Sequence, residues 1–326
     1  MNDPDADPVR QAAIPRPDGT PAVGVFLPTL TAPGAAPLDA VAAAQHAEQL
    51  GFESIWAIDQ LVAGAGAPLV DSVVALSAAA GATRRIRLGF GVMILPLRPV
   101  VWVAKQVASL QAVSGDRALL GVGVGGDRHD LSWRAAGVPR RQRGARTDRA
   151  LEVLPSLLRG EPTVVDTVTG AEVQLSPGVA VPPVLVGGTA PAALRRVVEH
   201  GDGWFTMPVP PETLATQVDE LRRAAIERGR PAPSITGSVT VALDGDPELP
   251  SQDQIARALT DPDGIFGMPA AAVGSILVTG GGDELRRRVQ GWASLGAERI
   301  VLTLAAGDWH RQLELVAEAL DERVPA

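Results

Sequence analysis

The 326-residue chain contains no cysteine and no tyrosine, and Lys105 is its one lysine. Without cysteine there can be no disulfide framework, no thiolate or iron–sulfur metal site and no cysteine nucleophile. Without tyrosine no phenol can serve as a general acid. A single lysine argues against Schiff-base chemistry and against phosphoryl transfer that relies on a P-loop lysine.

Positive charge and long apolar runs are also scarce. The 29 basic and 37 acidic side chains give a formal net charge of −8, whereas nucleic acids and anionic membranes are bound by dense basic faces. No apolar run approaches the roughly 18 residues of a transmembrane helix, and the polar residues 1–20 lack the apolar stretch of a secretory signal. We therefore expect no nucleic-acid or membrane partner, a disordered tail over 1–20, a single domain over 21–326 and a cytoplasmic location.

From residue 22 onward, short runs typical of strands alternate with longer runs at helical spacing. Alternation of this kind predicts parallel strands joined by helices, and eight such units in about 300 residues favour a (β/α)₈ TIM barrel over an open sheet. The predicted fold class is therefore α/β, a TIM barrel. The strand candidates begin near residues 22, 54, 87, 118, 184, 203, 235 and 299.

Two stretches interrupt the alternation. Residues 161–182 predict a β-hairpin around Thr169 and Gly170, and residues 248–275 are rich in Pro, Asp and Gly with one short helix. In a barrel these stretches are insertions after strand 4 and between strands 7 and 8. We expect both of them to shape the substrate side.

The carboxyl ends of the strands are where barrel enzymes carry out their chemistry. Strand 2 ends at Asp59 and Gln60, and strand 5 ends at Gly187, Gly188 and Thr189 directly before a helix. Glycines there leave backbone N–H groups unobstructed, and together with the helix dipole they favour an anion such as phosphate. A tight strand-to-helix turn that binds nothing accounts for the same residues.

Residues 121–126 form a glycine series that includes Gly123 and Gly125 at the end of strand 4. The series opens into a polar loop, so it is not the G-x-G-x-x-G of a dinucleotide site. It either lets a flat ring approach the backbone or packs closely against neighbouring strands. Asp127 and His129 follow on the catalytic face, and no histidine pair shows the spacing of a metal site.

Arginines are concentrated in residues 140–149. They form either a solvated entrance to a helix or a site that attracts the anionic tail of a cofactor.

Beyond these patterns, residues 22–320 resemble the bacterial luciferase-like family of flavin- and deazaflavin-dependent oxidoreductases. The matching stretches follow the order of that family and cover most of the barrel. They are LGFESIWAIDQL (50–61), IRLGFGVMILPLRPVVWVAKQVASLQAVSGDRALLGVGVGG (86–126), RGARTDRALEVLPSLLRG (143–160) and VPPVLVGGTAPAALRRVVEHGDGWF (181–205).

The resemblance implies a flavin-type ring over the carboxyl ends of the strands. It implies that Gly91 and Val92 form a bulge, in some members through a non-prolyl cis peptide, which supports the ring from behind. It also implies a cofactor-phosphate site at residues 187–189. The RGxRxD stretch (143–148) is more similar to the branch that uses the deazaflavin F420, with FMN as the alternative cofactor, and a homodimer is expected from the family.

Two departures from the family bear on the reaction. Gln60 stands where the family often has histidine, and Gly126 stands where the sugar-phosphate dehydrogenases of the family carry glutamate. Glutamine cannot shuttle a proton near neutral pH, so alcohol oxidation, which needs a base, is disfavoured.

The leading hypothesis is therefore an enzyme that uses reduced F420 to reduce a C=C or C=N bond of a small molecule. Asp59, Gln60, Asp127 and His129 are its catalytic candidates. Gln60 would orient the substrate or the ring, and Asp127 or His129 would be the proton source. A reduced-FMN monooxygenase and an inactive barrel that acts as a binding partner are the alternatives.

Overall fold

The computed structural model describes residues 19–31, 39–126, 130–206, 211–264 and 266–321. The tail expected over residues 1–20 lies outside this part of the chain, apart from its last two residues. In the described helices, no segment is both long enough and apolar enough to cross a bilayer.

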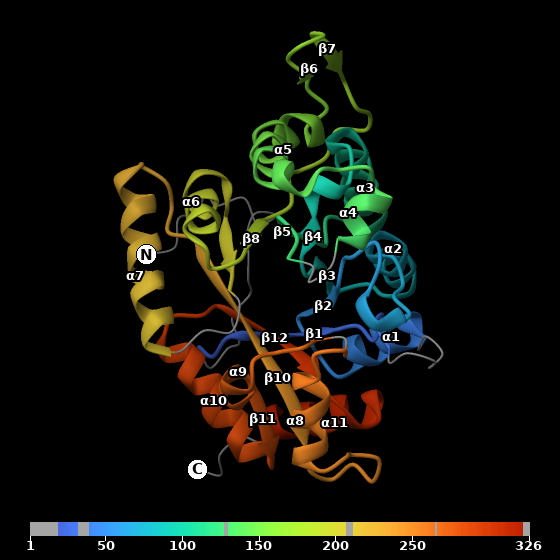
Figure 1. Cartoon of the computed structure of the whole chain (residues 1–326), viewed down its shortest axis with the longest axis vertical. Helices are drawn as coiled ribbons and strands as arrows, with labels where there is room; N and C mark the ends of the chain where they lie inside the picture. Colours follow the sequence, from blue (N-terminus) through green and yellow to red (C-terminus); the bar gives the residue numbers. More distant parts are fainter. Residues whose placement is uncertain (1–18, 32–38, 127–129, 207–210, 265, 322–326) are drawn as a thin grey trace.

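Within the described residues, eight parallel strands close into a barrel in which β10 pairs with both β12 and β9 (Figure 1). The predicted TIM barrel is therefore confirmed. Around the barrel the strands are β1 (Ala22–Phe26), β2 (Ser54–Ala57), β3 (Arg87–Phe90), β5 (Ala118–Gly123), β8 (Val184–Gly187), β9 (Gly203–Phe205), β10 (Ser234–Leu243) and β12 (Arg299–Leu304).

Helices connect successive strands and pack on the outside of the barrel (Figure 1). Local signals fix their ends: the Asp71 carboxylate accepts a hydrogen bond from the Val74 N–H at the start of α2, and Gly115 ends α3 with a φ of +67°. The helices are α1 (Ala40–Gln49), α2 (Ser72–Ala82), α3 (Val100–Ser114), α4 (Leu131–Ala135), α5 (Arg143–Leu158), α6 (Pro191–His200), α7 (Pro211–Glu227), α10 (Gly282–Ser294) and α11 (Trp309–Asp321).

The predicted hairpin forms from β6 (Thr163–Asp166) and β7 (Ala171–Val173), but it does not lie on the substrate side. It follows α5, which runs back from the carboxyl ends of the strands, and it precedes the amino end of β8. Gln111, in the last turn of α3, donates a hydrogen bond to the Ala180 carbonyl beyond the hairpin. The hairpin projects beyond α5, at the opposite end of the molecule from α8 (Figure 1). The expectation that it shapes the substrate side was wrong.

The second insertion lies between β10 and β12, as expected, and contains α8 (Gln252–Thr260) and α9 (Ala270–Ile276). It ends in β11 (Leu277–Gly280), a strand that was not among the predicted ones. β11 pairs with the carboxyl half of β10, whereas β9 pairs with the amino half. The insertion therefore extends the barrel wall at its carboxyl end.

The barrel interior is packed with large apolar side chains. Trp56, Leu119, Leu185, Phe205 and Val301 are buried there, with Phe26 and Val92 packed against them. Because this layer fills the middle of the barrel, any ligand has to lie above it, at the carboxyl ends of the strands.

Candidate active site

Val92 lies across the glycine-rich ends of two strands. The peptide bond between Gly91 and Val92 is cis, as the resemblance implied. A Cβ atom placed on Gly123 would lie 2.7 Å from Val92 Cγ2, and one on Gly187 would lie 3.2 Å from Val92 Cγ1. Both distances are shorter than ordinary contacts between carbon atoms. Glycine at these positions therefore leaves the space that the Val92 side chain occupies.

Gly125 has a different explanation. Its φ is +75°, and a Cβ there would lie 2.8 Å from Trp133 and 2.9 Å from Ile94. Trp133 is buried on α4 in a small cluster with Ile94 and Val138. Close packing of α4 thus accounts for this glycine, and its contact with a cofactor stays a prediction. Gly126, by contrast, is exposed, and nothing lies within 4 Å of a Cβ built on it.

The loop of Gly187, Gly188 and Thr189 is anchored directly before α6. Trp204 Nε1 donates a 2.7 Å hydrogen bond to the Gly188 carbonyl, and Gly188 has a φ of +109° that side-chain-bearing residues rarely adopt. α6 begins at Pro191, which has no N–H, and the Ala193 N–H donates to the Ala190 carbonyl, so an anion here would depend on the remaining N–H groups of the loop and the helix start. The loop therefore has the composition and the position of a phosphate site.

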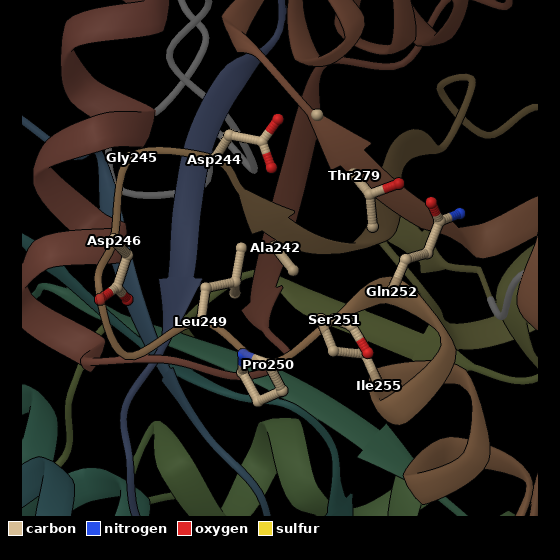
Figure 2. A pocket seen from close by; sticks show the side chains of 11 residues that line it. Ala242, Asp244, Gly245, Asp246, Leu249, Pro250, Ser251, Gln252, Ile255 and Thr279 are labelled. Carbon is tan, nitrogen blue, oxygen red and sulfur yellow. The ribbon is translucent and has the colours of Figure 1, made fainter.

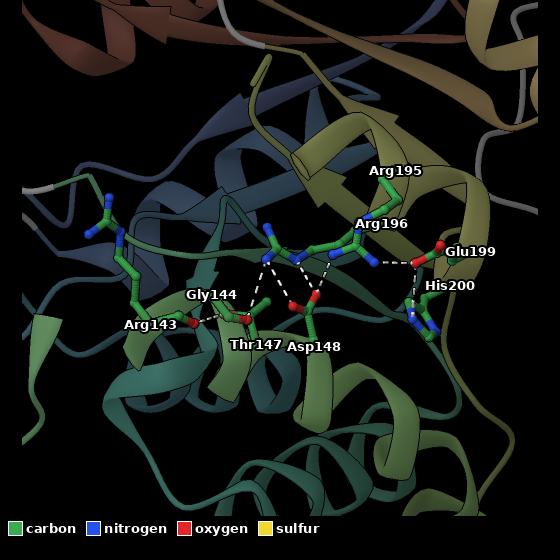
Figure 3. A network of polar contacts seen from close by, with 8 residues as sticks. All are labelled: Arg143, Gly144, Thr147, Asp148, Arg195, Arg196, Glu199 and His200. Carbon is green, nitrogen blue, oxygen red and sulfur yellow. Dashed lines mark hydrogen bonds and ion pairs between the residues drawn. The ribbon is translucent and has the colours of Figure 1, made fainter. Parts of the chain in front are cut away.

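An ion-pair network fixes α6 against α5, as Figure 3 shows. Arg196, only 5% exposed, donates from Nε to Asp148 Oδ1 at 2.7 Å and from Nη2 to the Gly144 carbonyl at 3.3 Å. Arg195 also contacts Asp148. The hydrogen bond from Arg196 holds the pKa of the Asp148 carboxyl below its ordinary value. The aspartate of the RGxRxD stretch therefore positions the helix that follows the glycine loop.

Arg140, Arg143 and Arg146 bond to groups of the protein itself. Arg146 donates to the Pro96 carbonyl, and Arg143 donates to the Arg140 carbonyl at the start of α5. Arg140 pairs with Asp130 at 2.8 Å. These contacts give the stretch a structural role, and attraction of a cofactor tail stays a prediction.

Asp59 is 5% exposed and accepts hydrogen bonds from three different segments. The donors are Ser72 Oγ at 2.8 Å, the Ile94 N–H at 2.8 Å, and both terminal nitrogens of Arg98 at 2.7 Å. Ile94 belongs to β4 (Met93–Ile94), which directly follows the cis peptide. Asp59 therefore ties the end of β2 to the segment that carries Val92, and a part in proton transfer stays a prediction.

Of the remaining catalytic candidates, Gln60 is partly buried next to Asp59, whereas Asp127 and His129 lie outside the described residues.

Two other histidines, His46 and His310, contact each other between α1 and α11, with their Nδ1 atoms 2.8 Å apart. Among the described residues no three histidine, aspartate or glutamate side chains are grouped to hold a metal ion.

A cavity of about 950 Å³ opens beside Phe26 at the carboxyl ends of β1 and β12, under α8. A Cβ on Gly91 would lie 2.5 Å from the Phe26 ring, so this ring separates the cavity from the cis peptide. The insertion after β10, which was expected to shape the substrate side, was the sequence signal for it. The lining residues are Phe26, Leu27, Pro28, Leu30, Thr31, Ile58, Pro250, Gln254, Ile255, Ala258, Leu259, Asp261, Asp263, Gly264, Phe266, Thr303, Leu304, Ala305, Ala306, Gly307 and Trp309.

A second cavity, of about 530 Å³, lies on the other side of the segment that leads into α8. Figure 2 shows Asp244, Gln252 and Thr279 around it. The two cavities share Pro250 and Ile255 as lining residues. The start of α8 is therefore the wall between them.

Comparison with known proteins agrees with this arrangement. The family of luciferase-like monooxygenases matches residues 22–320. The chain belongs to this family. The matched region of this luciferase-like chain includes every strand of the barrel and the glycine loop before α6.

Two relatives are about a third identical to this luciferase-like chain over the residues that align. An uncharacterised protein of Mycobacterium bovis is 34% identical over 171 residues, which are 52% of this chain and 58% of that protein. The 4-hydroxyprotoasukamycin monooxygenase of Streptomyces nodosus subsp. asukaensis is 30% identical over 200 residues, 57% of this chain and 53% of that enzyme. The chain thus matches little more than half the length of these relatives.

Solved structures of low sequence identity share the fold. An F420-dependent secondary alcohol dehydrogenase, solved with an F420–acetone adduct, superposes with a TM-score of 0.75 at 17% identity. The superposition covers 92% of this chain and 98% of the dehydrogenase.

Proposed function

We propose that this luciferase-like chain is an oxidoreductase that binds a flavin or deazaflavin, and that it uses reduced F420 to reduce a C=C or C=N bond in a small molecule. The observation that carries the proposal is the position of Val92 over Gly123 and Gly187, next to the anchored loop before α6. At Gly123 and Gly187 a Cβ would collide with the Val92 side chain, so the backbone there stays open. Such an open backbone beside a helix N-terminus suits a planar ring that carries a phosphate. The family and the alcohol dehydrogenase of the same fold support this assignment.

The reduced cofactor supplies a hydride, and the protein supplies binding and orientation. In this proposal Val92 supports the ring, and Gly187, Gly188 and Thr189 hold the phosphate. Asp59 keeps β4, and with it Val92, in place through its bond to the Ile94 N–H. The Gln60 amide orients the substrate or the ring, because an amide can both donate and accept hydrogen bonds but carries no titrating proton.

The decisive experiment is a cofactor titration of the full chain with F420 and with FMN, followed by substrate-dependent oxidation of the reduced cofactor. We expect saturable binding of F420 that is tighter than binding of FMN. No binding of either cofactor would sink the proposal, and binding without any turnover over a broad panel of enones and imines would favour the inactive barrel.

A reduced-FMN monooxygenase is the second candidate, and the name of the Streptomyces relative favours it. A deazaflavin does not activate oxygen as a flavin does. Oxygen uptake that requires both reduced FMN and substrate would therefore select this alternative. The homodimer expected from the family stays a prediction that sedimentation can test.

A further inference from the structure

The described residues that line the large cavity beside Phe26 carry no positive charge. Among its described lining residues there is no lysine, arginine or histidine, and its charged groups are Asp261 and Asp263. Both aspartates are exposed, so they lie at the solvent side of the cavity. The more deeply placed wall is apolar, with Ile255 and Leu259 from α8 facing the strand ends.

We propose that this cavity selects a largely apolar substrate that is neutral or carries an amine, and that it discriminates against carboxylates and phosphates. The identity of this ligand as the substrate rests on the proposed function. The charge preference does not, because it follows from the lining alone. A carboxylate that is enclosed by this lining loses hydration without gaining a cationic partner, which is unfavourable. Aspartates at the opening raise the local concentration of cations and repel anions.

The cavity also offers uncharged polar side chains, namely Thr31, Gln254 and Thr303. The Thr31 hydroxyl is buried and has no hydrogen-bond partner among the described residues. A hydroxyl can donate to a carbonyl and accept from an amine, so it suits both ligand types that the charges favour. A cavity of about 950 Å³ is large enough for a drug-sized molecule.

Phe26 connects this preference to the candidate reaction centre. Its ring lies against Gly91, the residue directly before Val92, and it also lines the cavity. An apolar ligand that packs on Phe26 is therefore held beside the position proposed for the ring.

The test uses the full chain and a neutral apolar dye, Nile red, whose fluorescence rises in apolar sites. Three matched competitors differ only in their polar end: phenylbutylamine, phenylbutanol and phenylbutyrate. The titrations are made without cofactor and with saturating F420. We expect the amine and the alcohol to displace the dye at concentrations about tenfold lower than the carboxylate does.

Paired variants show whether the lining causes the preference. Asp261→Asn combined with Asp263→Asn should reduce the ratio between the displacing concentrations of carboxylate and amine by about threefold or more. The matched control is Asp244→Asn, which removes a carboxylate from the second cavity and should leave this concentration ratio unchanged. Ala306→Phe, or the more exposed Ala258→Phe if the first does not fold, should weaken all three competitors together.

Three results would overturn the proposal: equal or tighter binding of the carboxylate, an equal effect of Asp244→Asn, or dye displacement that neither phenylalanine variant alters in folded protein. Failure of the proposed function gives a different result. In that case neither F420 nor FMN binds, while the order of the three competitors measured without cofactor still decides the charge preference.

Discussion

The carboxylate of Asp59 and the guanidinium of Arg98 form a bidentate ion pair at the carboxyl end of β2, with both N···O distances at 2.7 Å. The two residues are 39 positions apart in the sequence. The Asp59 side chain is 1% exposed and the Arg98 side chain 20% exposed, so water screens the pair little. Together with the Ile94 N–H, the pair fixes the segment that carries Val92.

Asp59→Asn should lower the free energy of unfolding by about 3–5 kcal/mol, because it leaves the largely buried Arg98 cation without its main partner. Denaturant unfolding measures this loss. The control is Asp71→Asn, which removes the weaker 3.4 Å contact between Arg98 and a half-exposed carboxylate. That change should cost less than about 1 kcal/mol. Equal losses in the two variants would contradict a dominant role for Asp59.

Gly123→Ala should weaken cofactor binding by on the order of tenfold, since the added methyl group displaces the Val92 side chain. The titration with F420 or FMN measures the change, and circular dichroism verifies the fold. Gly126→Ala is the matched control, because nothing lies within 4 Å of its new Cβ. Unchanged affinity in Gly123→Ala would argue against Val92 as the support of the ring.

Thr189→Ala tests the phosphate site before α6. If the loop binds phosphate, the variant should lose on the order of tenfold affinity for FMN, the value typical of a hydrogen bond to a charged group. Riboflavin, which has the same ring and no phosphate, should bind the variant and the parent protein alike. A loss that is equal for both ligands would show that the loop serves the ring or the fold instead.

Asp148→Asn should show a pH-dependent loss of stability. The pKa of Asp148 is lower in the folded protein than its ordinary value of 3.8, chiefly because Arg196 donates a hydrogen bond to it. Its contribution is therefore fully present above pH 3.8 and is lost as the pH falls through the lowered pKa. Since Asp148 is 37% exposed, we expect a loss of about 1 kcal/mol at pH 7.

Urea unfolding of both proteins at pH 7 and near pH 3 measures this dependence. The difference in stability between the two proteins should be smaller near pH 3 than at pH 7. A difference of the same size at both pH values would show that the carboxylate charge is not the stabilising element.

The sequence was sufficient to determine the barrel. Strands such as residues 118–123 are continuously apolar because both of their faces are buried, and the glycines and capping residues after each run mark where the chain turns. These signals are local, so they can be recognised without knowing what the chain packs against. The hairpin of residues 163–173 was predictable for the same reason.

Tertiary structure decided what the glycines and charged residues do. Gly123 and Gly187 are required by Val92, a side chain from a different strand end, and Asp148 is fixed by Arg196, 48 residues further along the chain. The face on which the hairpin lies depends on the direction of α5, and the cavity exists because α8 lies over the ends of β1 and β12. These properties arise from distances between segments remote in sequence. Composition and spacing identify such residues, but only the packing of the barrel determines which of them meet.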